Sequence, residues 1–285
     1  MIPSIWGAKL PYIGPAGPAS GHPVVIFRTN SLLSVSLRFC RLSAQRNGAA
    51  DADPAQPLLP LLSLAEQERC ARLPAIHASR AIVARALVRT ELAAALGVTP
   101  SSLVFVAGRH GKPALLDPPR PLAFNLSHSG EWVALAWHTG RDALSLGVDV
   151  EQRSAGRRDV MRLARRYFSH PEQLALEALA GAAREALFYR LWTLKEAWVK
   201  AHGLALAPQL GAVSFSLQDG ALAVANATQH DTGRFLHGET DGDACASLCV
   251  LAGEAQPVSV DAWIGMPRGD WSRMSLRGWS GSLSV

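Results

Sequence analysis

The sequence predicts an α+β protein built of two similar halves. Helical and strand-like patterns alternate in blocks, with helices followed by strands in the first half and the same order in the second. The chain has 285 residues, of which 48% are hydrophobic, so it can bury a large core. No internal repeat of short period is visible.

The first element after an irregular start is a strand. Residues 1–33 carry Pro and Gly at short intervals, which interrupts any apolar run, so we expect an irregular N-terminal extension there. Residues 34–43 alternate apolar and polar side chains, as a half-buried strand does. A linker rich in Pro and Ala follows over 48–60. We therefore expect the N-terminal half to begin at Ser34 and to span 34–140.

Helical periodicity begins near Ser63 and gives way to strands after Gly97. A short charged segment is followed by a longer helix over 79–96, for which Ser79 is the expected N-cap and Gly97 the residue after the end. Apolar segments separated by turns then predict strands, and they cover 103–107, 122–127, 132–138 and 144–151.

The C-terminal half, expected over 141–255, repeats the order of helices and strands. Helical patterns cover about 157–167, 171–179 and 182–202. Strand-like segments cover 212–217, 221–225 and 245–251. Beyond this point Trp263, Trp271 and Trp279 stand among Gly, Arg and Ser, and we expect an irregular tail over 256–285.

Composition narrows the class of protein. The net charge of +5 and the pI near 9.3 favour an anionic ligand or an acidic partner, although solubility explains a mild charge equally well. The four cysteines show neither a CxxC pair nor zinc spacing, which indicates reduced, buried thiols of a cytoplasmic protein. We expect no membrane association, because no segment resembles a signal peptide or a membrane span. The sequence contains no zinc-binding, helix-turn-helix or aromatic RNA-binding motif, so we do not expect nucleic-acid binding.

Two short segments bring carboxylates and a lysine together. Asp149 and Glu151 stand two apart in an apolar strand, so their side chains leave the same face. Glu196 and Lys200 stand four apart in a helix and share a face. Oxygen ligands without thiols favour Mg²⁺. Taken singly, the first pair can be solvated charge, and the second can be a helical ion pair worth about 0.2–0.5 kcal/mol.

Other polar segments suit phosphate. Ser127, His128 and Ser129 end a strand and open a tight turn, where hydroxyl, imidazole and backbone N–H groups can bind phosphate oxygens, although turn chemistry alone also explains them. Lys112 stands in a turn before Pro113. Arginines, whose guanidinium forks bind phosphate, recur along the first helices. They are Arg69, Arg72, Arg80, Arg85 and Arg89.

Four of these segments, in this order, resemble the recurring motifs of the Sfp-type 4′-phosphopantetheinyl transferases. The motifs are a GKP turn, an FNxSHS segment, a GxDxE segment and a WxxKEAxxK helix. Here they cover 111–113, 124–129, 147–151 and 192–200. The resemblance extends over about 34–255.

The resemblance implies a fold and a reaction. The fold is a pseudo-dimer of two α+β halves in one chain, with the active site in the cleft between them. The reaction is the Mg²⁺-dependent transfer of the 4′-phosphopantetheine arm of coenzyme A to a serine of apo acyl or peptidyl carrier proteins, with release of adenosine 3′,5′-bisphosphate. A cytoplasmic monomer serving polyketide or nonribosomal-peptide synthesis is expected. The alternative is a catalytically inactive module that binds coenzyme A or a carrier protein.

Residue roles follow from the same motifs. Mg²⁺ is expected at Asp149, Glu151 and Glu196. Glu196 is also the expected general base for the carrier serine, and Lys200 is expected to neutralise the pyrophosphate, whereas Lys195 is expected in a structural ion pair. Contacts to coenzyme A are expected from Arg69, Arg80, Lys112, Pro113, Ser127, His128 and Lys200. The basic segment 157–168 can receive an acidic carrier helix or can be a solvated face.

Overall fold

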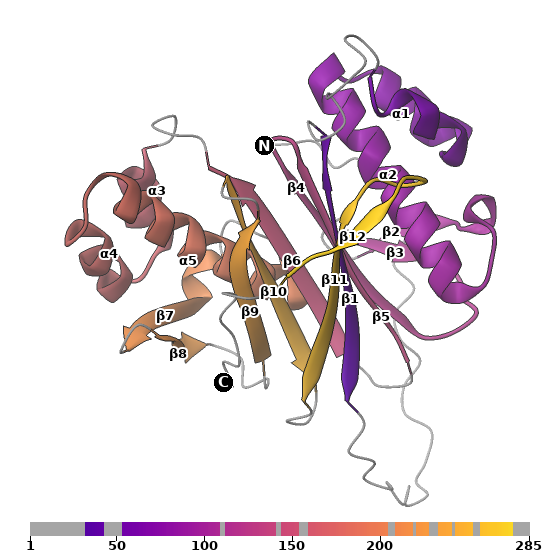
Figure 1. The fold of residues 1–285 in the computed structure, drawn as a ribbon. Helices are drawn as coiled ribbons and strands as arrows, with labels where there is room; N and C mark the ends of the chain where they lie inside the picture. Colours follow the sequence, from indigo (N-terminus) through magenta and orange to yellow (C-terminus); the bar gives the residue numbers. More distant parts are fainter. Residues whose placement is uncertain are drawn as a thin grey trace, which may run out of the picture.

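The structure, a computed structural model, describes most of the chain between residues 32 and 275 (Figure 1). The described ranges are 32–42, 53–108, 112–140, 144–153, 159–204, 209–218, 221–227, 233–240, 243–252 and 257–275. Residues 1–31 of the expected N-terminal extension, Gly111 of the GKP turn and Trp279 lie outside them.

Two sheets form the centre of the molecule. The larger sheet has the order β12-β11-β1-β5-β4, and the smaller one the order β6-β10-β9. Their strands are β1 (Leu33–Arg41), β4 (Leu122–Ser129), β5 (Trp132–Thr139), β6 (Leu144–Gln152), β9 (Gly233–Thr240), β10 (Ala244–Ala252), β11 (Val258–Gly265) and β12 (Trp271–Arg273). Two small hairpins add β2 (Phe105–Ala107), β3 (Pro113–Leu115), β7 (Val213–Gln218) and β8 (Ala221–Ala227).

One long helix covers the outer face of each sheet. The helices are α1 (Leu64–Ala71), α2 (Ala75–Leu96), α3 (Val160–Tyr167), α4 (His170–Glu177) and α5 (Gly181–Ala201). α2 packs against the larger sheet and α5 against the smaller one, so the order of layers is helix, sheet, sheet, helix (Figure 1). The predicted α+β class is confirmed.

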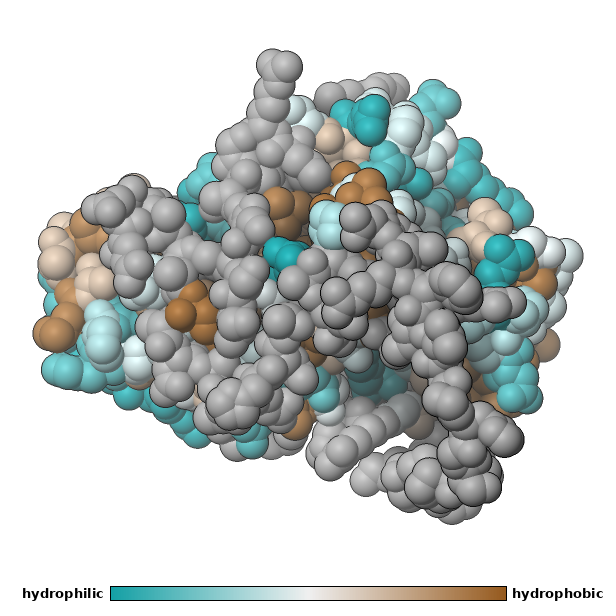
Figure 2. Space-filling view, turned by 90° about the horizontal axis from the view of Figure 1, so that it is seen from below, coloured by the Kyte–Doolittle hydropathy of each residue, from teal (hydrophilic) through white to brown (hydrophobic). Residues whose placement is uncertain are grey.

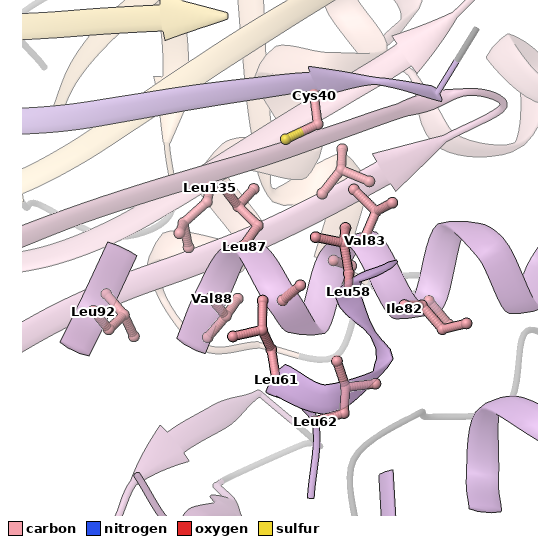
Figure 3. Packing of buried hydrophobic residues seen from close by; sticks show 14 of the residues in the cluster. Cys40, Leu58, Leu61, Leu62, Ile82, Val83, Leu87, Val88, Leu92 and Leu135 are labelled. Carbon is pink, nitrogen blue, oxygen red and sulfur yellow. The ribbon is translucent and has the colours of Figure 1, made fainter. Parts of the chain in front are cut away.

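Alternation along the strands explains the layers. On β1, Val35, Leu37 and Phe39 point between the two sheets, whereas Cys40 points to the α2 side. Figure 3 shows Cys40 and Leu135 of the larger sheet meeting Leu87 of α2. The strands are therefore apolar on both faces, as strands buried between two layers must be.

Helix starts differ from the sequence-based expectation. α2 begins at Ala75 after Pro74, so Ser79 lies inside the helix and its Oγ donates to Asp53 Oδ2 at 2.6 Å. The predicted end is confirmed, since Gly97 adopts φ 71°, which a glycine reaches without strain. The linker expected over 48–60 contains a 3₁₀ helix over Gln56–Leu61.

The helices of the two halves repeat the same local contacts. α1 and α4 each begin with a capping box, Ser63 with Glu66 and Ser169 with Glu172. Each capping glutamate also forms an ion pair with a buried basic side chain on the long helix that follows. The pairs are Glu66 with Arg89 at 2.8 Å and Glu172 with Lys195 at 2.9 Å. Because equivalent residues are equally spaced in both halves, the chain is a pseudo-dimer at the level of individual contacts.

The last described segment corrects the expected irregular tail. β11 pairs in parallel with β1, and β12 pairs antiparallel with β11, so part of the 256–285 region completes the sheet of the N-terminal half. Arg38 of β1 holds this segment, because its guanidinium lies 5.7 Å from the ring centres of both Trp263 and Trp271. These two tryptophans mark structural strands.

All four cysteines are unpaired, buried thiols, as expected. In the part of the chain that the structure describes, no helix is long and apolar enough to cross a membrane. Where Figure 2 colours the surface, hydrophobic residues stand singly among hydrophilic ones. Among the large hydrophobic side chains that are most exposed, Leu64 lies on α1 and Leu174 on α4, whereas Val104 and Leu116 flank the β2–β3 hairpin.

α5 approaches the smaller sheet closely at Gly147 of β6. A Cβ at this position would lie 1.9 Å from the carbonyl oxygen of Ala197 and 2.5 Å from the amide nitrogen of Ala201. Both atoms belong to the helix backbone, which cannot turn aside as a side chain can. Glycine at this position therefore sets how deeply α5 sits on the sheet.

We expect Gly147→Ala to lower the free energy of unfolding by about 1–3 kcal/mol, because α5 must move outward to admit the methyl group. Denaturant-induced unfolding followed by circular dichroism measures the change. Gly211→Ala is the matched control, since its added Cβ would meet an ordinary contact 4.0 Å from the Tyr167 carbonyl oxygen. Equal stability of the two variants would contradict this account of Gly147.

Candidate active site between the two halves

The two sheets meet at their edges through side chains. β4 is the edge of one sheet and β6 the edge of the other. The backbone N–H of Val148 donates to Asn125 Oδ1 at 2.8 Å, and the N–H of Val150 donates to Ser127 Oγ at 3.3 Å. Polar side chains of β4 therefore satisfy the edge of β6, in place of a backbone ladder.

The same strand holds both predicted carboxylates of β6. Ser127 Oγ donates to Asp149 Oδ1 at 2.8 Å, and Ser129 Oγ donates to Glu151 Oε2 at 2.6 Å. Asp149 is 2% exposed, so this hydrogen bond lies in the interior. The alternation of both strands brings serine and carboxylate to one face, which faces α5.

α5 supplies the remaining charged groups. Lys200 Nζ lies 2.5 Å from Asp149 Oδ1, 3.0 Å from Ser127 Oγ and 3.5 Å from Glu196 Oε2. These distances join the three elements β4, β6 and α5 in one hydrogen-bonded cluster. The structure thus brings together Ser127, Asp149, Glu196 and Lys200, as the motifs predict.

The pKa values of the two groups that α5 contributes to this cluster, Glu196 and Lys200, are both raised. Burial raises the pKa of Glu196 well above its usual range, and the neighbouring Asp149 charge adds to the shift. Burial disfavours the Lys200 charge, but Asp149 and Glu196 outweigh this effect and raise the pKa of its ammonium. Glu196 therefore sits in an excess of buried negative charge that Lys200 offsets only in part.

The donor set of this cluster fits a divalent cation. Asp149, Glu151 and Glu196 offer only oxygen atoms, and buried Asp149 Oδ2 finds no hydrogen-bond partner among the described residues. A cation would also relieve the repulsion that raises the pKa of Glu196. Within the described ranges, however, no three His, Cys, Asp or Glu side chains form a preassembled metal site. Lys200 and the two serines of β4 hold the carboxylates instead.

A basic group adjoins the cluster on the side of α2. Arg80 donates to the Gly130 carbonyl oxygen at 2.9 Å, and another of its nitrogens lies 3.1 Å from His77 Nδ1. Burial lowers the pKa of His128 to about 4, and the nearby charges of Arg80 and Lys200 add to the effect. His128 is therefore neutral near pH 7, between two cations that suit an anion.

Lys112 is held by the C-terminal half. Its Nζ donates to the carbonyl oxygens of Leu146 at 2.9 Å and Lys200 at 2.8 Å, next to the end of α5. Burial lowers the pKa of this ammonium to about 8. Lys112 and Pro113 also line a cavity of about 420 Å³, together with Phe124 and His202.

The other arginines of the first helices form a structural cluster. Arg89 Nε binds Glu66, and its Nη1 donates to the carbonyl oxygen of Pro100 at 2.6 Å. Arg85 is 2% exposed and lies close to Glu66 and Arg69. The proposed phosphate role of Arg85 and Arg89 is therefore corrected. No described contact joins Arg69 to Arg80 or His128.

Lys195 has the structural role that the sequence predicts. It is fully buried against Glu172, and its Nζ also donates to the carbonyl oxygen of Leu210 at 3.1 Å. Within one helical motif, neighbouring Lys195 and Glu196 thus point to different partners.

Two residues of the site escaped sequence-based reasoning. Asn125 stands two positions before Ser127, so strand alternation was the available signal for it. His77 stands three positions before Arg80 on α2, which places both on one helix face. Each of these signals becomes specific only once β4 is known to face β6.

Comparison with known proteins agrees with this geometry. Residues 145–249 match a family described as the 4′-phosphopantetheinyl transferase superfamily, and residues 54–140 match one described as the N-terminal part of 4′-phosphopantetheinyl transferase. A 4′-phosphopantetheinyl transferase of Bacillus subtilis is 32% identical over 57% of this chain and 69% of its own length. A phosphopantetheinyl transferase of Thraustochytrium sp. is 31% identical over 70% of this chain and 71% of its own.

Among solved structures, a holo-(acyl-carrier-protein) synthase from Bacillus anthracis str. Ames, in complex with CoA (3′,5′-ADP), is 16% identical. It covers 39% of this chain and 100% of its own, with a TM-score of 0.34. The two family matches together cover both halves of the pseudo-dimer, and the relatives agree with them. The chain therefore belongs to the Sfp-type 4′-phosphopantetheinyl transferases, the holo-carrier-protein synthases.

Proposed function

We propose that this enzyme transfers the 4′-phosphopantetheine arm of coenzyme A to a serine of apo acyl or peptidyl carrier proteins. Support comes above all from the convergence of Asp149, Glu196 and Lys200 at the junction of the two halves. Such a group of carboxylates and a cation suits phosphoryl transfer, in which catalysis is mostly positioning and charge stabilisation.

The chain's own residues would act on the proton and on the phosphates. The carrier serine Oγ attacks the β-phosphorus, the bond to the leaving phosphate oxygen breaks, and adenosine 3′,5′-bisphosphate departs. Glu196 would receive the serine proton, because its carboxylate lies beside Lys200 and Asp149 at the junction of the two halves, where the serine would meet the phosphates. Lys200, one helical turn after Glu196 on α5, would neutralise charge on the pyrophosphate.

Asp149, Glu151 and Glu196 would hold Mg²⁺, which when bound would neutralise the pyrophosphate and stabilise the charge that develops during transfer. The unpartnered Oδ2 of Asp149 supports this assignment.

Coenzyme A would lie between the halves. Arg80, His128 and Ser127 would contact its phosphates, and the cavity beside Lys112 and Pro113 would take an uncharged portion of the molecule. In that cavity Lys112 would shape the wall and would not pair with a phosphate, since its Nζ already donates to two carbonyl oxygens.

The carrier protein would dock on α3. Arg162, Arg165 and Arg166 of this helix are exposed, and α3 follows β6 closely along the chain. Carrier proteins with an acidic helix would meet this face with complementary charge. Because one chain supplies both sides of the cleft, we propose a monomer. Polyketide or nonribosomal-peptide synthesis is the proposed pathway class.

The direct test incubates the protein with coenzyme A, Mg²⁺ and purified apo-carriers of the fatty-acid, polyketide and nonribosomal-peptide types. Mass spectrometry of each carrier reports the added arm, and side-by-side rates report the preferred type. Binding of coenzyme A without modification of any carrier would favour the alternative, an inactive binding module.

We expect Glu196→Gln to lower kcat by about 100-fold or more, because the amide cannot accept the serine proton. Steady-state rates with a saturating carrier and coenzyme A give the measurement. Glu177→Gln, an equivalent change at an exposed position of α4, provides the control. Activity of Glu196→Gln within twofold of the unmodified protein would remove Glu196 from the role of base.

We expect the double variant Arg162→Glu/Arg165→Glu to raise KM for the carrier several-fold while leaving KM for coenzyme A unchanged, because only carrier docking uses this charge. The effect should shrink as salt rises. Arg72→Glu, at the exposed residue that follows the end of α1 in the other half, is the charge-reversal control. If the two changes act alike, docking does not occur on α3.

A further inference from the structure

A buried polar network lies between α5 and the smaller sheet, beside the carboxylate cluster. Ser247 of β10 stands directly opposite Asp149 of β6 on one side and opposite His237 of β9 on the other. Residues directly opposite in a sheet leave the same face. A polar row therefore crosses the sheet from the catalytic cluster to His237, underneath α5.

Hydrogen bonds join this row to the helix. Ser247 Oγ lies 3.0 Å from His237 Nδ1 and 2.8 Å from Thr193 Oγ1. Thr193 and Ser247 are fully buried, and His237 is 8% exposed. Buried polar groups are costly unless they are bonded, so each member restricts the position of the others.

His237 is a neutral member of the network. Burial lowers the pKa of its imidazole to about 3, and the charges of Arg190 and Arg153 add to the shift. A neutral imidazole has one donor and one acceptor nitrogen, so His237 can bond Ser247 without placing a charge under α5. The histidine thus serves as a fixed hydrogen-bonding group at neutral pH.

The network and Gly147 contact α5 at two separate points. Gly147 touches the helix backbone at Ala197 and Ala201, and Thr193 reaches Ser247 one turn earlier. Glu196 lies between these points. Many of the other side chains under the helix are apolar, and apolar contacts have no preferred direction.

We propose that His237 is a positioning residue for the transfer reaction: through Ser247 and Thr193 it fixes the rotation of α5, and with it the placement of Glu196 against Asp149. This inference rests on the proposed function of the same site. Glu196 belongs to a helix, so a small rotation moves its carboxylate across the sheet. Misplacement of a reacting group by about 1 Å can cost about 100-fold in rate.

The test measures kcat and KM for four variants. His237→Leu and Ser247→Ala should each lower kcat by about 10- to 100-fold, with KM for coenzyme A and carrier within twofold. The double variant should be no slower than the worse single one, because the network acts as a unit. His237→Asn, which can place a polar atom near the position of Nδ1, should recover most of the rate.

Thr240→Val is the matched control. Thr240 lies on the same strand, is fully buried, and its Oγ1 has no hydrogen-bond partner in the described part of the chain. It should keep the unmodified kcat. An equal loss in this control, a change in KM alone, or no recovery with His237→Asn would overturn the proposal. If His237→Leu does not fold, the isosteric Thr193→Val replaces it, with the same expected loss of kcat.

A second measurement separates this inference from the proposed function. Denaturant unfolding of His237→Leu, Ser247→Ala and the double variant gives their coupling without any substrate. If the unmodified protein modifies no carrier, the proposed function fails, whereas non-additive unfolding still supports the network. Additive unfolding overturns it.

Discussion

Side-chain bonding between β4 and β6 is the constraint on which the rest of the structure depends. Each strand ends its own sheet, and a strand edge needs partners for its N–H groups. Asn125 and Ser127 supply them to Val148 and Val150. The Ser127 hydroxyl accepts the N–H of Val150 in place of a backbone carbonyl. The same hydroxyl also bonds Asp149 and Lys200. The contact that joins the halves therefore also assembles the candidate active site.

Much of the fold could be predicted from the sequence, because the spacing of apolar residues reflects which face of a helix or strand is buried. The long helix of each half and the strands β1, β4, β5 and β6 were predicted from alternation and helical spacing. β11 and β12 were missed, because β1, the partner of β11, lies far away in sequence. Trp263 contacts Arg38 of that distant strand and Asp261 of its own. The predicted start of α2 at Ser79 was wrong. The Ser79 hydroxyl donates to Asp53, which is distant in sequence, and capping rules consider only neighbouring residues.

The site was predictable where residues act within one element, and less so where they act across elements. Asp149, Glu151, Glu196 and Lys200 follow from spacing within a strand or a helix, and the structure brings them together. Arg85 and Arg89 were misread, because a helix face shows that two arginines are neighbours but not that Glu66 neutralises them. The Ser127 and Ser129 hydroxyls have clear partners only after the two sheets are placed edge to edge.

The repeated helix contacts carry one more consequence. By the equivalence of Arg89 with Lys195, the next residue on α2, Thr90, occupies the place that Glu196 has on α5. Thr90 Oγ1 returns its hydrogen bond to Ala86 of its own helix at 2.9 Å and so takes no part in a cluster. The same arrangement of helices and ion pairs thus occurs twice, with a carboxylate at this position in the C-terminal half and a hydroxyl in the N-terminal half. Two halves of like architecture can in this way form a candidate site whose two sides differ in chemistry.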